Sequence, residues 1–339
     1  MFDRAQAPFT ASASFLMALQ PLLVAHSKNA AGGFDYSVPS SVMVSEGLKL
    51  VISSALLCSQ LVSGKVGRLL HEDAALEFFS YVLPALIYFV NNNCVFFILQ
   101  AVDPTTFQLL SQMKTIFTGL LFRVFLKRRL TVVQYLALAT LACGTACSQL
   151  PGPDAACHGG SRHSSLLGLA LSVLSALLSA LGGIYSEKLL KGRASASIHW
   201  QNIQLYVWGV AFNLLGVWLK DAAPLREHGL LAGYDGRAWA VVLCNALNGL
   251  AISAVLKYAD NIARVYAHAI AMVLTMLAAV QMHGKPLSPQ LILAVVMVAA
   301  STLQYNLPQR LLHGLDALDT PAASEVAPLT GANKKTNGV

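Results

Sequence analysis

Apolar residues gather into long runs along this chain, and short polar turns separate the runs. A helix needs about 20 apolar residues to cross roughly 30 Å of hydrocarbon. Ten runs approach this length, near residues 9–26, 41–63, 76–100, 103–122, 130–150, 165–187, 201–219, 237–257, 262–283 and 288–307. The pattern predicts an all-α polytopic membrane protein with ten transmembrane helices. The first run is the weakest, and we expect it to be retained rather than cleaved, because no basic segment and cleavage site accompany it.

The same segmentation divides the chain into three parts. Residues 1–8 are expected to form a cytosolic N-terminus, and residues 9–308 the ten-helix domain, with halves at about 9–150 and 165–308. Residues 309–339 are polar and rich in Pro and Ala, which favours a disordered cytosolic tail.

The distribution of basic residues sets the expected orientation. With the N-terminus in the cytosol, fourteen Lys and Arg residues fall on the cytosolic side and six on the other, and Arg264 is counted among the fourteen. This bias favours cytosolic placement of both termini. The net charge of +7 therefore reflects membrane topology, and it does not indicate a nucleic-acid partner.

A weak internal repeat supports the even number of spans. A shift of 157 residues, which carries Leu130 onto Leu287, also places Thr145 on Thr302 without a gap. The shift covers five helices, so the two halves must have opposite orientations in the membrane. Inverted repeats with a binding site near the midplane are typical of secondary transporters. The alternative is that apolar helices resemble one another by composition alone.

Composition makes the charged residues within these runs informative. The chain is 55% hydrophobic and only 12% charged, whereas soluble domains carry roughly 25% charged residues. Lys49, Lys114 and Lys257 nevertheless lie within apolar runs or at their edges. A charge at bilayer depth costs at least about 2.5–3.5 kcal/mol and usually faces a polar cavity. Cations in such a cavity indicate an anionic cargo.

The third run contains a cluster of amides. Tyr88, Asn91 and Asn92 have the spacing i, i+3, i+4 and share one helix face. Amides donate and accept hydrogen bonds, which suits the edge of a nucleobase, and an aromatic ring suits stacking on its face. Hydrogen bonding between helices is the alternative for this cluster.

Further polar residues share helix faces with the lysines or with each other. Glu46 and Lys49, at i, i+3, are expected to form an internal charge pair or gate. Lys257 is close enough to a helix end to reach the interface, and Tyr206 has the alternative of an interfacial anchor. The remaining candidates are Phe107 and Ser111 with Lys114, Asn202 with Tyr206, and Ser253 with Lys257.

Little in the sequence indicates catalysis. Five of the six cysteines fall in apolar runs, where a thiol behaves as a small hydrophobe, and no His, Cys or carboxylate spacing predicts a metal site. Ser172, Ser175, Ser179, Gly182 and Gly183 form a small-residue stripe, which we interpret as helix packing. We expect no catalytic residue, no metal and no cofactor.

Six stretches, in order along residues 41–308, carry a family resemblance: EGLKL, YFVNNN, AVDPTTFQLLSQMK, IYSEKLLK, QNIQLYVWG and NGLAISAVLKYADNI. Together they resemble the nucleotide-sugar transporter family, within the drug/metabolite transporter superfamily. The greatest likeness is to the branch of the CMP-sialic acid and UDP-galactose transporters. Phe107 and Ser111 stand where these carriers tend to have Tyr, and Asn91 stands where Gln is common, which leaves the sugar and the base open.

The resemblance implies a transporter domain of ten helices in two inverted repeats. It also implies exchange of a pyrimidine nucleotide sugar for a nucleoside monophosphate. The implied location is the Golgi membrane, with the endoplasmic reticulum as the alternative. Tyr88, Asn91 and Asn92 would contact the base, and Lys114 the phosphate. Asn202 and Tyr206 would contact the ribose or base, and Ser253 and Lys257 the nucleotide. Membrane lipid is the other implied partner, and a homodimer is left open.

Other classes of function compete with transport of a nucleotide sugar. A membrane enzyme would need clustered carboxylates or a metal site, and Asp103, Glu187 and Asp260 are scattered singly. A carrier of other phosphorylated metabolites would keep the lysines but would not need the amide cluster. A scaffold or regulator of the same fold would need neither group.

Overall fold

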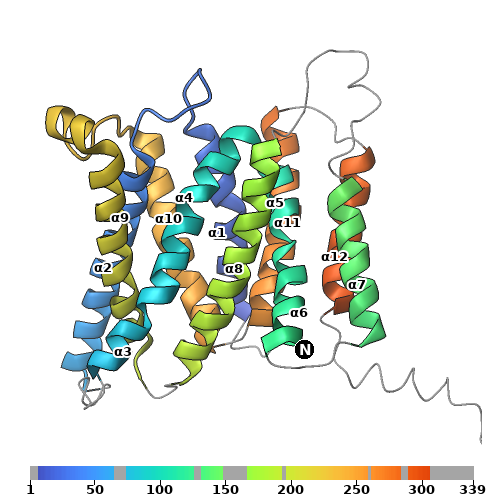
Figure 1. Ribbon diagram of the computed structural model, residues 1–339, viewed down its shortest axis with the longest axis horizontal. Helices are drawn as coiled ribbons and strands as arrows, with labels where there is room; N and C mark the ends of the chain where they lie inside the picture. Colours follow the sequence, from blue (N-terminus) through green and yellow to red (C-terminus); the bar gives the residue numbers. More distant parts are fainter. Residues whose placement is uncertain are drawn as a thin grey trace, which may run out of the picture. The chain divides into compact units, whose positions relative to one another are not determined.

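The computed structural model describes residues 7–64, 74–125, 131–147, 166–192, 196–258, 261–283 and 289–305, and the predicted tail lies outside them. Within these ranges the fold is entirely helical (Figure 1). The helices are α1 (Ala7–His26), α2 (Val38–Val62), α3 (Ala74–Ser80), α4 (Val82–Ala101), α5 (Pro104–Ser111), α6 (Lys114–Phe125), α7 (Val132–Cys147), α8 (Leu166–Gly192), α9 (Ile198–His228), α10 (Gly236–Tyr258), α11 (Asn261–His283) and α12 (Pro289–Tyr305).

Within the described residues every predicted apolar run coincides with helix, and two of the runs are divided. The third run breaks at Tyr81, between α3 and α4, and the fourth breaks at Gln112 and Met113, between α5 and α6. At the second break the N–H groups of Gln112 and Met113 donate to the carbonyls of Leu109 and Leu110, three residues back. This is the tighter 3₁₀ pattern, which often marks a functional point within a helix. The break places Lys114 at the first residue of α6.

Local sequence explains where several helices begin. Asp103 accepts a hydrogen bond from the Thr106 N–H at 3.0 Å and precedes a proline, so it caps α5. Asp235 accepts from the Ala238 N–H at 2.8 Å at the start of α10. Side-chain oxygens at these positions satisfy backbone donors that have no partner within the helix.

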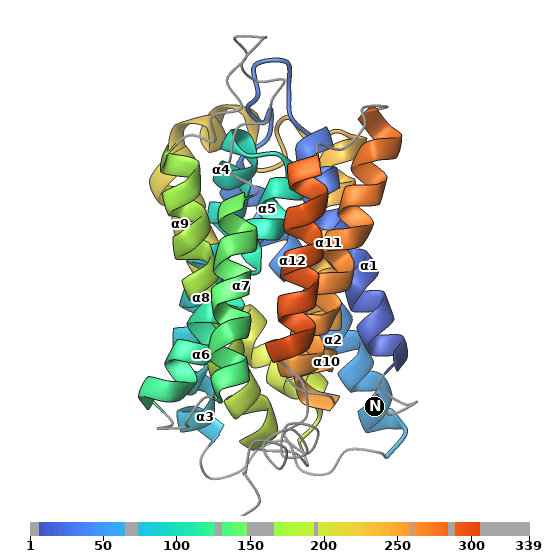
Figure 2. The same cartoon turned by 90° about the vertical axis from the view of Figure 1, so that its right-hand side faces the viewer.

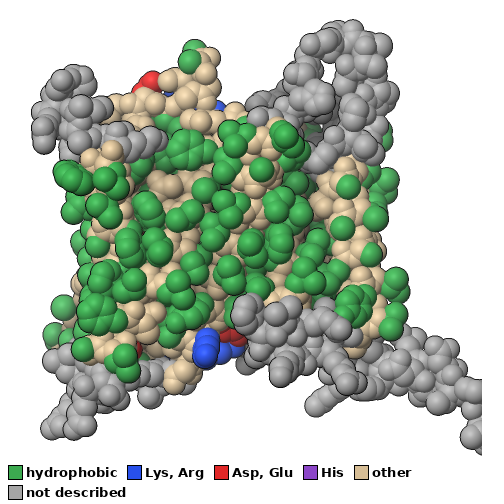
Figure 3. Space-filling model, in the orientation of Figure 1, with side chains coloured by type: hydrophobic (Ala, Val, Ile, Leu, Met, Phe, Trp, Pro, Cys, Tyr) green, Lys and Arg blue, Asp and Glu red, His purple; other side chains and the backbone are tan. Residues whose placement is uncertain are grey.

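The bundle has the surface of a membrane protein. Six helices of the described residues are long and apolar enough to cross a bilayer, and three shorter apolar helices accompany them. Large apolar side chains face outward, among them Val132, Leu166 and Trp218, while charged side chains gather near the two ends (Figure 3). Many Ser, Thr, Asn and Gln side chains are instead buried. The chain is a multi-pass membrane protein.

The helices pack in pairs that surround a polar centre. α2 packs against α9, α1 against α10 and α11, α4 against α8, and α6 against α8. α7 and α12 form a further pair, side by side in Figure 2, which packs against α11. Gly144 lets these two helices approach closely, because an added Cβ would lie only 3.0 Å from the Cβ of Met297.

Aromatic residues join the loops at one end of the bundle. The Tyr36 hydroxyl lies 2.8 Å from the Ser27 hydroxyl, and the Tyr234 hydroxyl lies 3.0 Å from that of Ser40. Burial raises the pKa of Tyr36 to about 12, so this hydroxyl stays protonated and able to donate at neutral pH. The two tyrosine rings lie 5.7 Å apart and tie the loop after α1 to the loop before α10.

Candidate functional site

A cavity lined by many polar side chains lies among the described helices, and its wall draws on α1, α2, α4, α5, α6, α8, α9, α10 and α11. Nine of the ten residues predicted to bind substrate line it: Tyr88, Asn91, Asn92, Phe107, Ser111, Lys114, Asn202, Tyr206 and Ser253. Glu46 and Lys49 line it as well. The structure therefore brings together side chains from helices that are far apart in the sequence.

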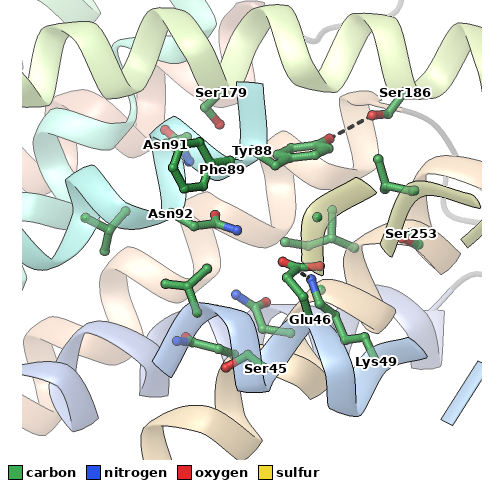
Figure 4. A pocket seen from close by; sticks show the side chains of 18 of the residues that line it. Ser45, Glu46, Lys49, Tyr88, Phe89, Asn91, Asn92, Ser179, Ser186 and Ser253 are labelled. Carbon is green, nitrogen blue, oxygen red and sulfur yellow. Dashed lines mark hydrogen bonds and ion pairs between the residues drawn. The ribbon is translucent and has the colours of Figure 1, made fainter. Parts of the chain in front are cut away.

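The aromatic and amide face of α4 is held by serines of α8. The Tyr88 hydroxyl donates to the Gly182 carbonyl at 3.2 Å and lies 2.9 Å from the Ser186 hydroxyl. The Ser175 hydroxyl donates to Oδ1 of Asn91 at 2.8 Å. Figure 4 shows Tyr88 reaching toward Ser186 and Asn91 lying near the α8 backbone. The small-residue stripe thus positions cavity side chains, which an interpretation as packing alone had missed.

The predicted charge pair on α2 is present and buried. Nζ of Lys49 lies 2.6 Å from Oε1 of Glu46, and both side chains are nearly inaccessible. Two glycines make room for the pair: a Cβ on Gly249 would lie 2.8 Å from Cδ of Lys49, and one on Gly209 would lie 3.0 Å from Oε2 of Glu46. Nζ of Lys49 also sits 4.6 Å from the ring centroid of Tyr206.

Lys114 is a buried cation without a partner among the described residues. The residue is 4% exposed, and its Nζ makes no hydrogen bond within the described part of the chain. Asn202 also has a buried polar atom without a hydrogen-bond partner among the described residues, its Oδ1. Since a buried polar group without a partner costs about 1–3 kcal/mol, and a charged one more, this arrangement is suited to a bound anionic ligand.

The remaining predicted residues differ in how they meet the cavity. Ser111 lines it, although its hydroxyl donates to the Phe107 carbonyl at 2.8 Å within the same helix. Tyr206 is 1% exposed and its hydroxyl lies 3.4 Å from that of Ser253, so it is an interior residue rather than an interfacial anchor.

Lys257 is the predicted residue that does not line the cavity. Its Nζ donates to the Ala196 carbonyl and to Oε1 of Gln201, both at 2.5 Å. Gln201 itself lines the cavity. Lys257 therefore holds the segment before α9 and positions Gln201, without itself lining the cavity.

Arg264 is the main residue that the sequence interpretation missed. It was assigned to a cytosolic loop, but it lies in the first turns of α11, is only 6% exposed and lines the cavity. Removing it from the topology count leaves thirteen basic residues against six, so the bias is kept. Its i, i+4 spacing to His268, another wall residue, is the pattern that predicts a shared helix face.

Several amides outside the predicted set also face the cavity. Nδ2 of Asn248 donates to Oε1 of Gln20 at 2.7 Å, and Nε2 of Gln108 donates to the Met17 carbonyl at 2.7 Å. Oδ1 of Asn245, Oδ1 of Asn248 and Oε1 of Gln108 are buried without partners among the described residues. These oxygens are acceptors that a ligand rich in hydroxyl groups would satisfy.

The described part of the chain holds no cluster of His, Cys, Asp and Glu able to bind a metal ion. The wall of its cavity combines basic side chains, amides and aromatic rings.

A multi-pass helical bundle around a cationic cavity defines a membrane protein of the transporter class, and comparison with known proteins gives the family. The nucleotide-sugar transporter family matches residues 11–306. The chain belongs to this family.

Curated relatives agree with that assignment, and one solved structure shares the fold. The chain is 36% identical to the CMP-sialic acid transporter 1 of Arabidopsis thaliana over 301 residues, which are 87% of this chain and 86% of the relative. It is 31% identical to the UDP-galactose translocator of Bos taurus over 300 residues, 86% of this chain and 75% of the relative. A crystal structure that is 16% identical superposes with a TM-score of 0.59, over 92% of this chain and 99% of the other, which shows the shared fold.

Proposed function

We propose that this protein is an antiporter that imports a pyrimidine nucleotide sugar, UDP- or CMP-linked, from the cytosol into the lumen of the Golgi in exchange for a nucleoside monophosphate. The observation that carries the proposal is Lys114, a buried cation without a protein partner in a wall of amides and aromatic rings. The printed names of the relatives, which include CMP-sialic acid and UDP-galactose transporters, support the same class of cargo.

The cavity offers a separate surface for each part of a nucleotide. Tyr88, Asn91 and Asn92 form the proposed base face, and Asn202 and Tyr206 of α9 line the same cavity. Lys114 binds the phosphate, since a compact ammonium suits a phosphate oxygen. Ser253 lies beside Tyr206 and contributes to the nucleotide site, while Lys257 acts through Gln201. Phe107 and Ser111 complete the wall next to Lys114.

The electrostatics of the empty cavity favour exchange over free passage. Glu46 and Lys49 neutralise each other, but the buried Nζ of Lys114 has no hydrogen-bond partner among the described residues. Moving an uncompensated cation through a closed intermediate is costly, whereas a bound nucleotide supplies the opposite charge. The loaded carrier therefore changes conformation more readily than the empty one, and the Glu46–Lys49 pair serves as a gate beside the site.

We also propose that ten spans form two inverted repeats, at about 9–150 and 165–308. The helix packing supports this, because the 157-residue shift carries α1 onto α8, α4 onto α10 and α6 onto α11. Under this correspondence the pair α1–α10 matches α8–α4, and the pair α1–α11 matches α8–α6, and all four pairs are in contact. An inverted repeat provides the two equivalent conformations that alternating access needs.

The decisive experiment is uptake into proteoliposomes that contain the purified protein. Vesicles preloaded with UMP or CMP should accumulate labelled UDP-galactose or CMP-sialic acid, and empty vesicles should accumulate little. Lys114→Ala should abolish the difference. If preloaded vesicles take up a small phosphorylated metabolite but no nucleotide sugar, the protein is a different carrier of the same fold.

A further inference from the structure

Two small clusters of hydrogen bonds join α2 and α9 at their ends. At the first, the Ser40 hydroxyl in the first turn of α2 donates to the Leu230 carbonyl at 2.7 Å and lies 3.0 Å from the Tyr234 hydroxyl. Leu230 and Tyr234 lie in the loop between α9 and α10, and Ser40 itself is 1% exposed. We name Ser40, Leu230 and Tyr234 the Ser40 clasp.

The second cluster lies at the other end of the same two helices. The Ser197 hydroxyl, one residue before α9, donates to Oε1 of Gln60 in the last turn of α2 at 2.7 Å. Nε2 of Gln204 in α9 donates to Oε1 of Glu77 in α3 at 3.2 Å. We name Ser197, Gln60, Gln204 and Glu77 the Ser197 clasp. Figure 1 shows α3 at one end of the bundle and the loop between α9 and α10 at the other.

The two clasps are equivalent under the proposed inverted repeat. The 157-residue shift carries Ser40 onto Ser197 and Glu77 onto Tyr234. It also carries α2 onto α9, the helix against which α2 packs. Because an inverted repeat places equivalent positions on opposite sides of the membrane, each side has one clasp in which a serine near the start of a helix binds the partner helix or its loop. Two alternating entrances require such a matched pair of contacts.

The cavity lies between the clasps along the α2–α9 pair. Val42, two residues after Ser40, lines the cavity, and so does Gln201, four residues after Ser197. Each clasp depends on side-chain hydrogen bonds, which individually contribute little net stability and can therefore break and form again. A clasp of this kind can hold an entrance closed without locking it.

We propose that the Ser40 clasp and the Ser197 clasp close the two entrances of the cavity, and that they open in alternation. This inference rests on the proposed function, because an exchanger must not open its site to both sides at once. Both clasps are formed in this structure, so it corresponds to the closed conformation through which the loaded carrier passes. Under the proposed orientation, the Ser40 clasp faces the lumen and the Ser197 clasp faces the cytosol.

The test locks each clasp separately and then both together. In the full-length protein, with its six native cysteines replaced, Ser40→Cys and Tyr234→Cys allow one lock, and Gln60→Cys and Ser197→Cys allow the other. A short bifunctional thiosulfonate joins each pair, and a reducing agent releases it. Because the cargo must pass both entrances in turn, either single lock should lower nucleotide exchange to less than about a tenth, and reduction should restore it.

Entry to the cavity needs a readout that does not depend on nucleotides. A water-soluble imidate modifies lysine amines, and mass spectrometry gives the rate for Lys114, which lines the cavity and is 4% exposed. Lys191, whose side chain is 42% exposed on α8, is the internal reference. Either single lock should leave the Lys114 rate within about threefold of the unlocked protein, because the other entrance still opens. Both locks together should slow it at least about tenfold, since only local unfolding then exposes the site.

Three results overturn the proposal. Exchange that continues under either single lock means that the clasp need not open, and rapid modification of Lys114 under both locks means that the clasps do not close the entrances. Slow modification under one lock alone means that the cavity has a single entrance. The matched control lock joins Ala137→Cys to Ser301→Cys, where α7 and α12 meet outside the cavity wall. It should change neither exchange nor modification.

Hydroxyl deletions test the same point if a cysteine pair does not crosslink. Ser40→Ala and Ser197→Ala should each speed the modification of Lys114 about fivefold, because the loss of a typical hydrogen bond favours the open entrance by that factor. Thr140→Ala is the control and should leave the rate unchanged, since Thr140 donates within α7 to the Leu136 carbonyl at 3.0 Å. Equal rates in the wild-type protein and all three variants overturn the alternating clasps.

The modification of Lys114 also separates this inference from the proposed function. If the locks give the expected pattern of modification but the wild-type protein exchanges no nucleotide, the alternating clasps stand and the proposed function fails. If the wild-type protein exchanges nucleotides and continues to do so under the locks, the function stands and the clasps fail.

Discussion

Lys114→Met should stabilise the empty protein while it abolishes transport. Methionine keeps most of the volume of the lysine side chain and removes the charge from a position that is 4% exposed and has no protein partner for Nζ. A charge at the bilayer centre costs at least about 2.5–3.5 kcal/mol on insertion scales, although a position that lines a polar cavity, as Lys114 does, incurs only part of that cost. We therefore expect a gain in the free energy of unfolding of about 1–2 kcal/mol, as part of the insertion cost.

The same substitution should weaken nucleotide binding, although it stabilises the empty protein. A hydrogen bond to a charged group contributes about 1.5–3 kcal/mol, which corresponds to a loss of about 10- to 150-fold in affinity. Thermal denaturation of the purified protein, with and without UMP, measures both effects. The apparent melting temperature without ligand should rise, the shift caused by UMP should disappear, and exchange in proteoliposomes should fall to background.

Lys191→Met is the matched control for this experiment. Lys191 is 42% exposed and pairs with Glu187 at 2.8 Å on the surface of α8, and exposed pairs contribute only about 0–1 kcal/mol. The control should leave the UMP shift intact and change stability little. A Lys114→Met protein that is less stable than wild type and still stabilised by UMP would falsify the assignment of Lys114 as the central anion site.

Three further predictions concern selectivity, the gate and coupling. Asn92→Ala should change the rank order of CMP, UMP, GMP and AMP as competitors of uptake, because a mismatched base leaves a buried amide unsatisfied at a cost of about 1–3 kcal/mol. An unchanged rank order would indicate that Asn92 only joins helices. Gly249→Ala should displace Lys49, whose Cδ would lie 2.8 Å from the new Cβ, and should slow exchange more than it weakens UMP binding. Equal effects on exchange and on binding would place the Glu46–Lys49 pair in the binding site instead of at a gate. Uptake should depend steeply on UMP or CMP inside the vesicle and weakly on a pH gradient, and strong uptake by empty vesicles under a pH gradient would instead make Glu46 a proton site.

The hydrophobic pattern predicted the helices well, because burial in lipid needs a long apolar run whatever the neighbouring helices do. It did not predict the break at Gln112 and Met113. No proline or glycine marks that position, and Gln112 is drawn into a tertiary contact in which its Nε2 donates to the His268 carbonyl at 3.1 Å. A contact with a residue so distant in the sequence leaves no local pattern.

Cavity residues could be predicted from the sequence where a polar side chain interrupts a long apolar run. Lys114 and the amides of α4 stood out because each lies deep within an apolar run. Arg264 did not stand out, because basic residues near the end of a run look like loop residues under the positive-inside rule. Lys257 shares a helix face with Ser253, so it was predicted to contact the nucleotide. Its Nζ instead donates to Gln201 and to the Ala196 carbonyl, and no local sequence pattern indicates these distant partners.

The distribution of satisfied and unsatisfied groups separates scaffold from site in this protein. Glu46 with Lys49, and Lys257 with Gln201, are groups whose hydrogen-bond partners belong to the protein, so no ligand is needed to satisfy them. Among the described residues, Nζ of Lys114 has no such partner, and Arg264 donates only to the neutral hydroxyl of Ser179 while its Nε is unsatisfied, so we expect their energy to depend on the cargo. Under the proposed exchange, that difference couples transport to binding. A carrier with every charge paired internally would close empty as readily as loaded, and it would let the gradient of its cargo dissipate.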